Sequence, residues 1–96
     1  MPDYFMGMVH AVHDGEAFGA YQGVAVPTVT QYGGKMVWLS SNVEAADGDW
    51  QPLGMVLFEF ESSAQARKWY NSPEYQAVID QRFSSVDSNT VFIDVD

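Results

Sequence analysis

Hydrophobic side chains gather in four short stretches of the chain that are typical of β-strands. The first stretch, residues 4–12, is apolar on both of the faces that a strand presents, because neither set of alternate positions turns polar before His10. Residues 35–41 and 54–60 form similar stretches, and residues 90–95 form the last expected strand. Strands without a polar face are expected to be covered on both sides.

A helical repeat separates the first two expected strands. Between residues 17 and 32 the apolar positions recur every three or four residues, which traces one stripe along a helix. Asp14 is placed to cap the start of this helix. Gly33 and Gly34 supply the left-handed backbone that commonly ends one. Pro27 is expected to kink the helix or to split it just before the proline.

Helical patterning returns after the third expected strand. Ser62 and Gln65 match a capping box, and a helix follows through Tyr70. Residues 72–74, Ser-Pro-Glu, restart the helix with an N-cap serine, a proline at the first helical position and an acid in the first turn. Residues 42–53, which hold turn signals, form a long connector between the second and third strands.

The order of these elements is β-α-β-β-α-β, so we expect one ferredoxin-like α+β domain over residues 1–96. Its helices would cover one face of an antiparallel sheet and leave the other, equally apolar, face in water. At about 25 cal/mol per Å², a bare face of several hundred Å² represents on the order of ten kcal/mol of unburied apolar surface. The simplest cover is the same face of a second copy. The sequence therefore predicts a homodimer through the sheet face, a dimeric α/β barrel.

Two sets of strand residues are candidates for this uncovered face. One set is Val9, Val37, Val56 and Phe58, and the other is Met8, Met36 and Leu57.

Composition narrows the environment and the partners. The chain has a net charge of −9 and only four basic residues, so it repels phosphate backbones and anionic membranes. No apolar run approaches the ~18 residues of a transmembrane helix. The start, Met1-Pro2-Asp3, lacks the basic residues of a secretory signal, and the absence of cysteine fits a reducing compartment. We expect a cytoplasmic protein that binds neither nucleic acid nor membrane.

Several segments resemble one bacterial family. They are Tyr32-Gly33-Gly34-Lys35, Asp47-Gly48-Asp49-Trp50-Gln51-Pro52, Phe58-Glu59-Phe60, the stretch 69–76 and Arg82. Over nearly its whole length the chain resembles the family catalogued as domain of unknown function thirteen-thirty, within the dimeric α/β-barrel superfamily. The stretch 69–76, Trp-Tyr-Asn-Ser-Pro-Glu-Tyr-Gln, is the most specific part.

This resemblance implies a ferredoxin-like dimer. Superfamily relatives include cofactor-free monooxygenases, lactone isomerases and haem enzymes, which place a small-molecule pocket between sheet and helices. The family often carries Arg-Gly near the end of the second strand, where this chain has Leu39-Ser40-Ser41. If that arginine binds an anion in relatives, this chain binds something different or nothing.

Two ionisable residues stand inside otherwise apolar strands and are the candidate catalytic residues. An imidazole is suited to act as a general base near neutral pH, which makes His10 a candidate, although a strand histidine is often simply packed. Glu59 must be paired, hydrogen-bonded or shifted in pKa, unless it lies at an ordinary solvated rim. His13 with Asp14 and Glu16 does not predict a metal site, because strand positions three apart point to opposite faces. No metal and no cofactor are expected.

One arginine and several aromatic residues are candidates for binding a ligand. Arg82 shares a helical stripe with Tyr75 and Ile79, where it would clamp a ligand carboxylate or pair with an acidic side chain across the dimer. The candidate ligand-binding residues are Tyr21, Trp38, Trp69, Tyr75 and Arg82. Aromatic residues at these spacings also commonly form the core.

No motif identifies a nucleophile, so the sequence leaves two functions open. One is a cofactor-free enzyme that acts on a small organic molecule held between sheet and helices. There His10 or Glu59 would move a proton, while Arg82 and the aromatic residues hold the substrate. The alternative is a non-catalytic small-molecule-binding or structural homodimer. A haem enzyme is disfavoured because neither expected helix holds a histidine to ligate the iron.

Overall fold

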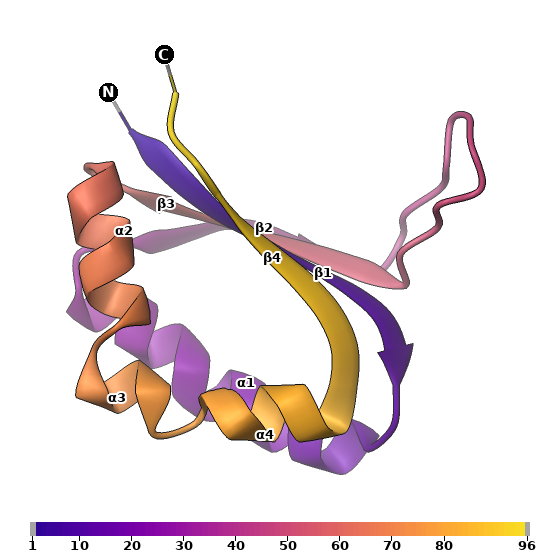
Figure 1. The fold of residues 1–96 in the computed structure, drawn as a ribbon, viewed down its shortest axis with the longest axis horizontal. Coiled ribbons are helices and arrows are strands. Elements are labelled where there is room, and N and C mark those ends of the chain that lie inside the picture. Colours follow the sequence, from indigo (N-terminus) through magenta and orange to yellow (C-terminus); the bar gives the residue numbers. More distant parts are fainter. Residues whose placement is uncertain (1, 96) are drawn as a thin grey trace.

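The computed structural model describes residues 2–95 and has a four-stranded antiparallel sheet with its helices on one side (Figure 1). The strands are β1 (Asp3–Val12), β2 (Lys35–Ser40), β3 (Gly54–Phe60) and β4 (Val86–Ile93), in the spatial order β2-β3-β1-β4. The helices are α1 (Gly15–Gln31), α2 (Ser63–Tyr70), α3 (Pro73–Gln76) and α4 (Ile79–Ser85). The predicted ferredoxin-like α+β architecture is confirmed.

The helix starts follow the sequence signals. Asp14, Ser62 and Ser72 cap α1, α2 and α3, and each side chain accepts a hydrogen bond from the backbone N–H three residues further on. Gln65 does not return to its own cap as a capping box would have it. Instead its side-chain amide donates to the carbonyl of Tyr32. That bond fastens the start of α2 to the end of α1.

Helix α1 runs without a break through Pro27, so the expected split is wrong. A proline ring crowds the carbonyl four residues earlier, which belongs to Gly23, and leaves that carbonyl without its helical partner. Both residues lie on the exposed side of α1, where water reaches the backbone. On the opposite side Ala25 and Val29 are buried in the core, and this packing holds the helix together across the proline.

The last strand begins at Val86, four residues before its predicted start. Helix α4 passes directly into this strand at Ser85, whose carbonyl accepts hydrogen bonds from the backbone N–H groups of His13 and Asp14 at 2.8 and 3.1 Å. The first half of β4 is the polar sequence Asp-Ser-Asn-Thr over residues 87–90, which gave no apolar signal for a strand.

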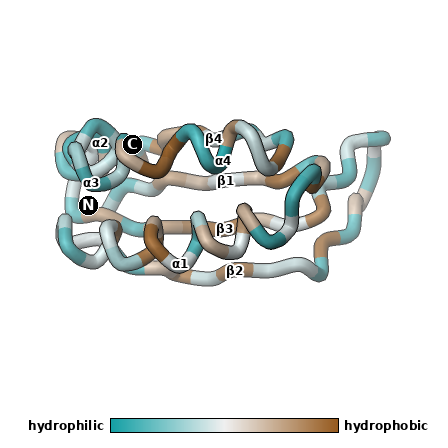
Figure 2. Tube along the Cα trace, turned by 90° about the horizontal axis from the view of Figure 1, so that it is seen from below, coloured by the Kyte–Doolittle hydropathy of each residue, from teal (hydrophilic) through white to brown (hydrophobic). Residues whose placement is uncertain are grey.

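The two faces of the sheet have different surroundings. One face carries Phe5, Phe58 and Phe60, which pack against the helices and form the core. Figure 2 looks onto this helical layer and shows α1 lying across β3 and β2, with α4 along β4 and β1. The opposite face, which carries Met6 and Leu57 among others, has no helix over it.

Irregularities in register decide which residues belong to which face. The pairing of β2 with β3 shifts between Met36 and Trp38, so that Met36 lies opposite Phe58 and Trp38 opposite Leu57. This bulge places Met36 on the helix-covered side and Trp38 on the uncovered side. The uncovered face therefore holds Met8 and Leu57, as one of the two predicted sets had it, but Met36 is replaced there by Trp38.

The two glycines that follow α1, Gly33 and Gly34, are required for different reasons, one for backbone conformation and the other for lack of space. Gly33 has φ +82°, the left-handed conformation expected at a helix end. Gly34 has no such strain, but it is buried against the core. A Cβ added there would lie 2.5 Å from Cε1 of Phe60 and 2.8 Å from Cγ1 of Val29.

We predict that Gly34→Ala lowers the free energy of unfolding by about 1–3 kcal/mol, because Phe60 and Val29 have to move away from the added methyl group. Urea denaturation measures this. Gly19→Ala is the matched control, since a Cβ at this exposed helical position meets nothing within 4 Å. That variant is expected to gain about 0.5–1 kcal/mol in stability. Equal effects of the two substitutions would contradict the close approach at Gly34.

Candidate functional site

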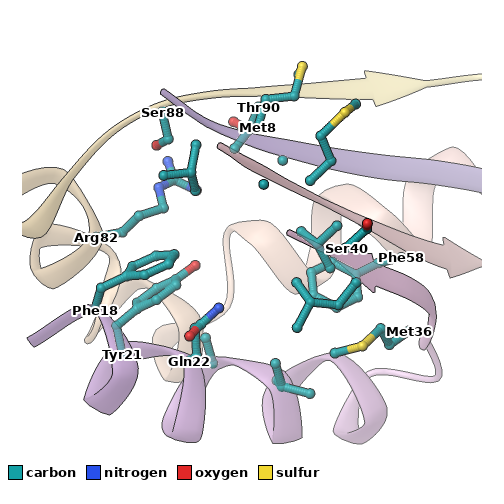
Figure 3. A pocket seen from close by; sticks show the side chains of 18 of the residues that line it. Met8, Phe18, Tyr21, Gln22, Met36, Ser40, Phe58, Arg82, Ser88 and Thr90 are labelled. Atoms are coloured by element: carbon teal, nitrogen blue, oxygen red, sulfur yellow. The ribbon is translucent and has the colours of Figure 1, made fainter. Parts of the chain in front are cut away.

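A cavity of about 470 Å³ lies between the helix-covered face of the sheet and helices α1 and α4 (Figure 3). It exists because small residues meet at this point. Gly7 occupies the middle of β1 between Val56 of β3 and Thr90 of β4, and Ala25 faces the cavity from α1. The large aromatic side chains that fill the rest of the layer begin at Phe5, two residues earlier on the same strand face.

The two ends of the cavity differ in polarity. Figure 3 shows Arg82 and Ser88 facing Tyr21 and Gln22 at one end, with Met36, Phe58 and the hydroxyl of Ser40 at the other. Residues Leu39 and Leu53, which line the cavity near β2 and the start of β3, are more than half exposed. They mark one side on which the cavity opens. The shape suits a molecule with one polar end and an apolar body.

Arg82 is the charged group of this site. It is only 6% exposed, and its Nη1 donates a hydrogen bond to the hydroxyl of Tyr75 at 2.9 Å. Its Nε is buried and finds no partner within residues 2–95. The guanidinium carbon lies 4.8 Å from the ring centroid of Phe83. The ion pairs among residues 2–95 all lie elsewhere, so no carboxylate within this range neutralises Arg82.

Two tyrosine hydroxyls extend this site from Arg82 towards α1. The oxygens of Tyr21 and Tyr75 are 2.7 Å apart. The Tyr75 oxygen accepts from Arg82, and no acceptor other than Tyr21 lies beside it among the described residues. The Tyr75 proton therefore points to Tyr21, which leaves the Tyr21 proton free for an oxygen in the cavity. Burial raises the pKa of both hydroxyls above the ordinary value of 10.0, so both remain neutral donors at physiological pH.

Trp69 forms the inner wall behind these groups. Its ring centroid lies 4.3 Å from that of Tyr75, and its indole N–H donates to the hydroxyl of Thr28 at 2.9 Å. Trp69, Tyr21 and Arg82 line the cavity, whereas Tyr75 stands behind the wall and reaches it through the hydroxyl of Tyr21. Four of the five candidate ligand-binding residues thus come together in one place.

The fifth, Trp38, does not line this cavity. The bulge in β2 turns it to the uncovered face, where it lies opposite Leu57 and is 39% exposed. Conversely, Gln22, Ser88 and Thr90 line the cavity but were not predicted as site residues. No pattern in the sequence marked Ser88 and Thr90, because residues 87–90 are all polar and the last strand was predicted to begin only at residue 90.

The two candidate catalytic residues lie outside the cavity and apart from each other. His10 is the extra residue of a bulge between Val9 and Ala11 of β1, and its buried Nε2 has no partner among the described residues. Glu59 lies opposite Tyr4 and pairs with Lys35 at 3.4 Å. Six strand positions separate Tyr4 from His10, which corresponds to roughly 20 Å. The two side chains cannot act on one small molecule within a single protomer.

Within residues 2–95 no group of three or more histidine, aspartate or glutamate side chains could hold a metal ion. No helix in this part of the chain has the length and apolarity needed to cross a bilayer.

We predict that the hydrogen-bonded Tyr75 hydroxyl makes the fold less stable in alkaline solution. Its folded-state pKa lies above the unfolded value near 10.0, so the stabilisation is complete below pH 10 and is lost as pH rises beyond it. The loss is about 1.4 kcal/mol per pH unit for one group. Urea unfolding between about pH 9 and 11 should show a shallower decline for Tyr75→Phe than for the unsubstituted chain. If the free energy of unfolding falls with pH equally in both proteins, the raised pKa of Tyr75 is not the cause of the decline.

Comparisons with known proteins agree with this fold. The chain is similar to a protein of unknown function from Rhodopseudomonas palustris, with 22% identity, a TM-score of 0.79 and coverage of 98% of this chain and 82% of that chain. A dimeric ferredoxin-like protein of unknown function from Jannaschia sp. CCS1 matches at 12% identity and a TM-score of 0.73, over 99% of this chain and 100% of that one. A cofactor-independent oxygenase from Streptomyces nogalater matches at 9% identity and a TM-score of 0.64, over 99% of this chain and 93% of that one.

At these identities the solved structures show the fold alone. No functionally curated protein matches the chain significantly. A family model described as a domain of unknown function, DUF1330, matches residues 2–95. Because that match extends over nearly the whole sequence, the chain belongs to the DUF1330 family, as the segments around Trp69 and Tyr75 indicated.

Proposed function

We propose that this protein binds a small organic molecule between sheet and helices and acts on it without a cofactor. The observation that carries the proposal is the cavity of about 470 Å³, which lies within the size range of ligand pockets. It combines apolar walls with a small group of convergent polar side chains, as ligand sites do. The similarity in fold to a cofactor-independent oxygenase supports the proposal by analogy.

The chemistry that these residues support is stabilisation of negative charge on a substrate oxygen. Arg82 and the hydroxyl of Tyr21 are fixed donors beside an apolar cavity, where such donors act more strongly than in water. No aspartate, glutamate or histidine is among the described residues that line the cavity. The substrate therefore has to arrive ionised or lose its proton to water, while Arg82 and Tyr21 hold the resulting oxyanion.

The same absence of a protein base favours the alternative, a non-catalytic binding protein. The two functions differ in the fate of the bound molecule. Native mass spectrometry of the purified protein, before and after incubation in air, measures the mass of whatever remains bound. A change in that mass supports catalysis, and an unchanged ligand supports binding alone.

The cavity itself is tested with the neutral fluorescent probe N-phenyl-1-naphthylamine. We predict that the probe brightens on binding and that Thr90→Trp weakens its binding at least about tenfold, because the indole fills the cavity from the sheet side. Thr30→Trp is the control, since Thr30 is exposed on α1 and lies outside the cavity. Equal binding by both variants would rule out the cavity as the probe site.

We also propose that two copies associate through the uncovered sheet face. The face exposes Trp38 and Val91 beside Met6 and Leu57, an apolar surface that a second copy would cover. The similar Jannaschia structure is described as dimeric, which supports the same arrangement here.

We predict that Leu57→Lys raises the dimer dissociation constant at least about a hundredfold, because each dimer would bury two unpaired ammonium groups. Size-exclusion chromatography with light scattering across a concentration series measures this. Val24→Lys introduces the same charge at an exposed position of α1 and should leave the dimer intact. A dimer that survives Leu57→Lys but not Val24→Lys would place the interface on the helices.

A further inference from the structure

We infer that the molecule held in this cavity is an organic monoanion, a carboxylate or an ionised hydroxyl compound, with its charged oxygen between Arg82 and Tyr21 and its apolar body directed towards Met36 and Phe58. This inference rests on the proposed ligand-binding function and adds the charge class and orientation of the ligand.

The first argument is the missing counter-charge. A buried guanidinium is costly unless it is paired with an anion. The chain has thirteen acidic and four basic residues, so an acidic partner for Arg82 would have been easy to supply. The neighbours of the guanidinium are instead the neutral Tyr75 hydroxyl and the Phe83 ring, and Nε has no partner among the described residues. An anion bound in the cavity would complete this site.

An acid from a second copy does not supply the missing charge in the proposed dimer. Arg82 belongs to α4, on the helix-covered side of the sheet, and the proposed dimer contact lies on the opposite side (Figure 1). The sheet therefore stands between Arg82 and the partner. The pairing across the dimer that the sequence left open conflicts with this placement.

The second argument concerns the size of the charge. Arg82 is the one cation among the described residues that line the cavity, and the other polar groups near it, such as Tyr21, Ser88 and Thr90, are neutral hydroxyls. One guanidinium balances one negative charge. The rest of the chain is strongly acidic, with a net charge of −9, and repels additional negative charge on the ligand. A phosphate monoester, which carries nearly two charges, fits this site less well than a carboxylate.

The third argument gives the orientation. Tyr21 approaches from α1 and Arg82 from α4, so their donor groups flank the same end of the cavity (Figure 3). The bonds from Arg82 to Tyr75 and on to Tyr21 align these donors in advance. The opposite end holds Met36 and the buried Phe58 (Figure 3). An amphiphilic molecule would therefore place its anionic group between Arg82 and Tyr21 and its apolar part against Met36 and Phe58.

The experiment compares 2-naphthoate with its neutral isostere 2-naphthamide by isothermal titration calorimetry. We expect the unsubstituted protein to bind naphthoate at least about tenfold more tightly than naphthamide, and Arg82→Gln to abolish this preference. Arg67→Gln is the matched control, because it removes the same charge from a half-exposed residue that is paired with Asp94 outside the cavity. That control should keep the preference, and 2-naphthyl phosphate should bind the unsubstituted protein more weakly than naphthoate.

The outcomes separate the two proposals. Equal binding of naphthoate and naphthamide, or tighter binding of the phosphate, overturns the monoanion and leaves the cavity as a binding site. Failure of both naphthalene compounds and of N-phenyl-1-naphthylamine to bind overturns the proposed function and this inference with it. If circular dichroism shows that Arg82→Gln is unfolded, Tyr21→Phe replaces it. This variant should weaken naphthoate binding about three- to tenfold and leave naphthamide unchanged, and equal losses for both compounds would overturn the inference.

Discussion

The packing of Trp69 holds the layers of this protein together. Its indole ring lies 5.0 Å from the ring of Phe5 on β1 and 5.5 Å from that of Phe60 on β3, while its N–H donates to Thr28 on α1. The tilted ring of Tyr75 on α3 packs behind it, with the two ring centroids 4.3 Å apart. One side chain thus joins the sheet to helices from both halves of the chain. Because these contacts concentrate at one end of the layer, the other end stays open between Gly7 and Ala25, where the cavity forms.

Most of the fold could be predicted from local patterns. The N-caps at Asp14, Ser62 and Ser72 and the buried stripe through Ala25 and Val29 appear in the structure as expected, because capping and helical periodicity depend on residues close together in sequence. The errors in the elements arose where tertiary contacts prevail. Burial of one side of α1 outweighs the cost of Pro27, and pairing with β1 makes a strand of the polar residues 87–90.

The candidate site was predictable only in part, because the sheet register decides which strand residues line it. Tyr21, Trp69 and Arg82 come from regular helices, where spacing determines the direction of a side chain, and they line one cavity. Trp38 and His10 lie at bulges, and a shift of one residue changes the face to which a strand side chain points. No rule of alternation locates such a bulge. The lack of an acidic partner for Arg82 was likewise visible only once the helices were packed.

The bulge in β2 also joins two compartments that would otherwise be independent. Within three residues this strand gives Met36 to the cavity and Trp38 to the face proposed as the dimer contact. A ligand that displaces β2 at Met36 would also move Trp38 against the second copy. Thermodynamic linkage then requires the two effects to be reciprocal. If a ligand strengthens dimer association by some factor, the dimer binds that ligand more tightly than the monomer by the same factor. Occupancy of the cavity would thus vary with protein concentration, and an edge strand would act as the mechanical link between assembly and binding.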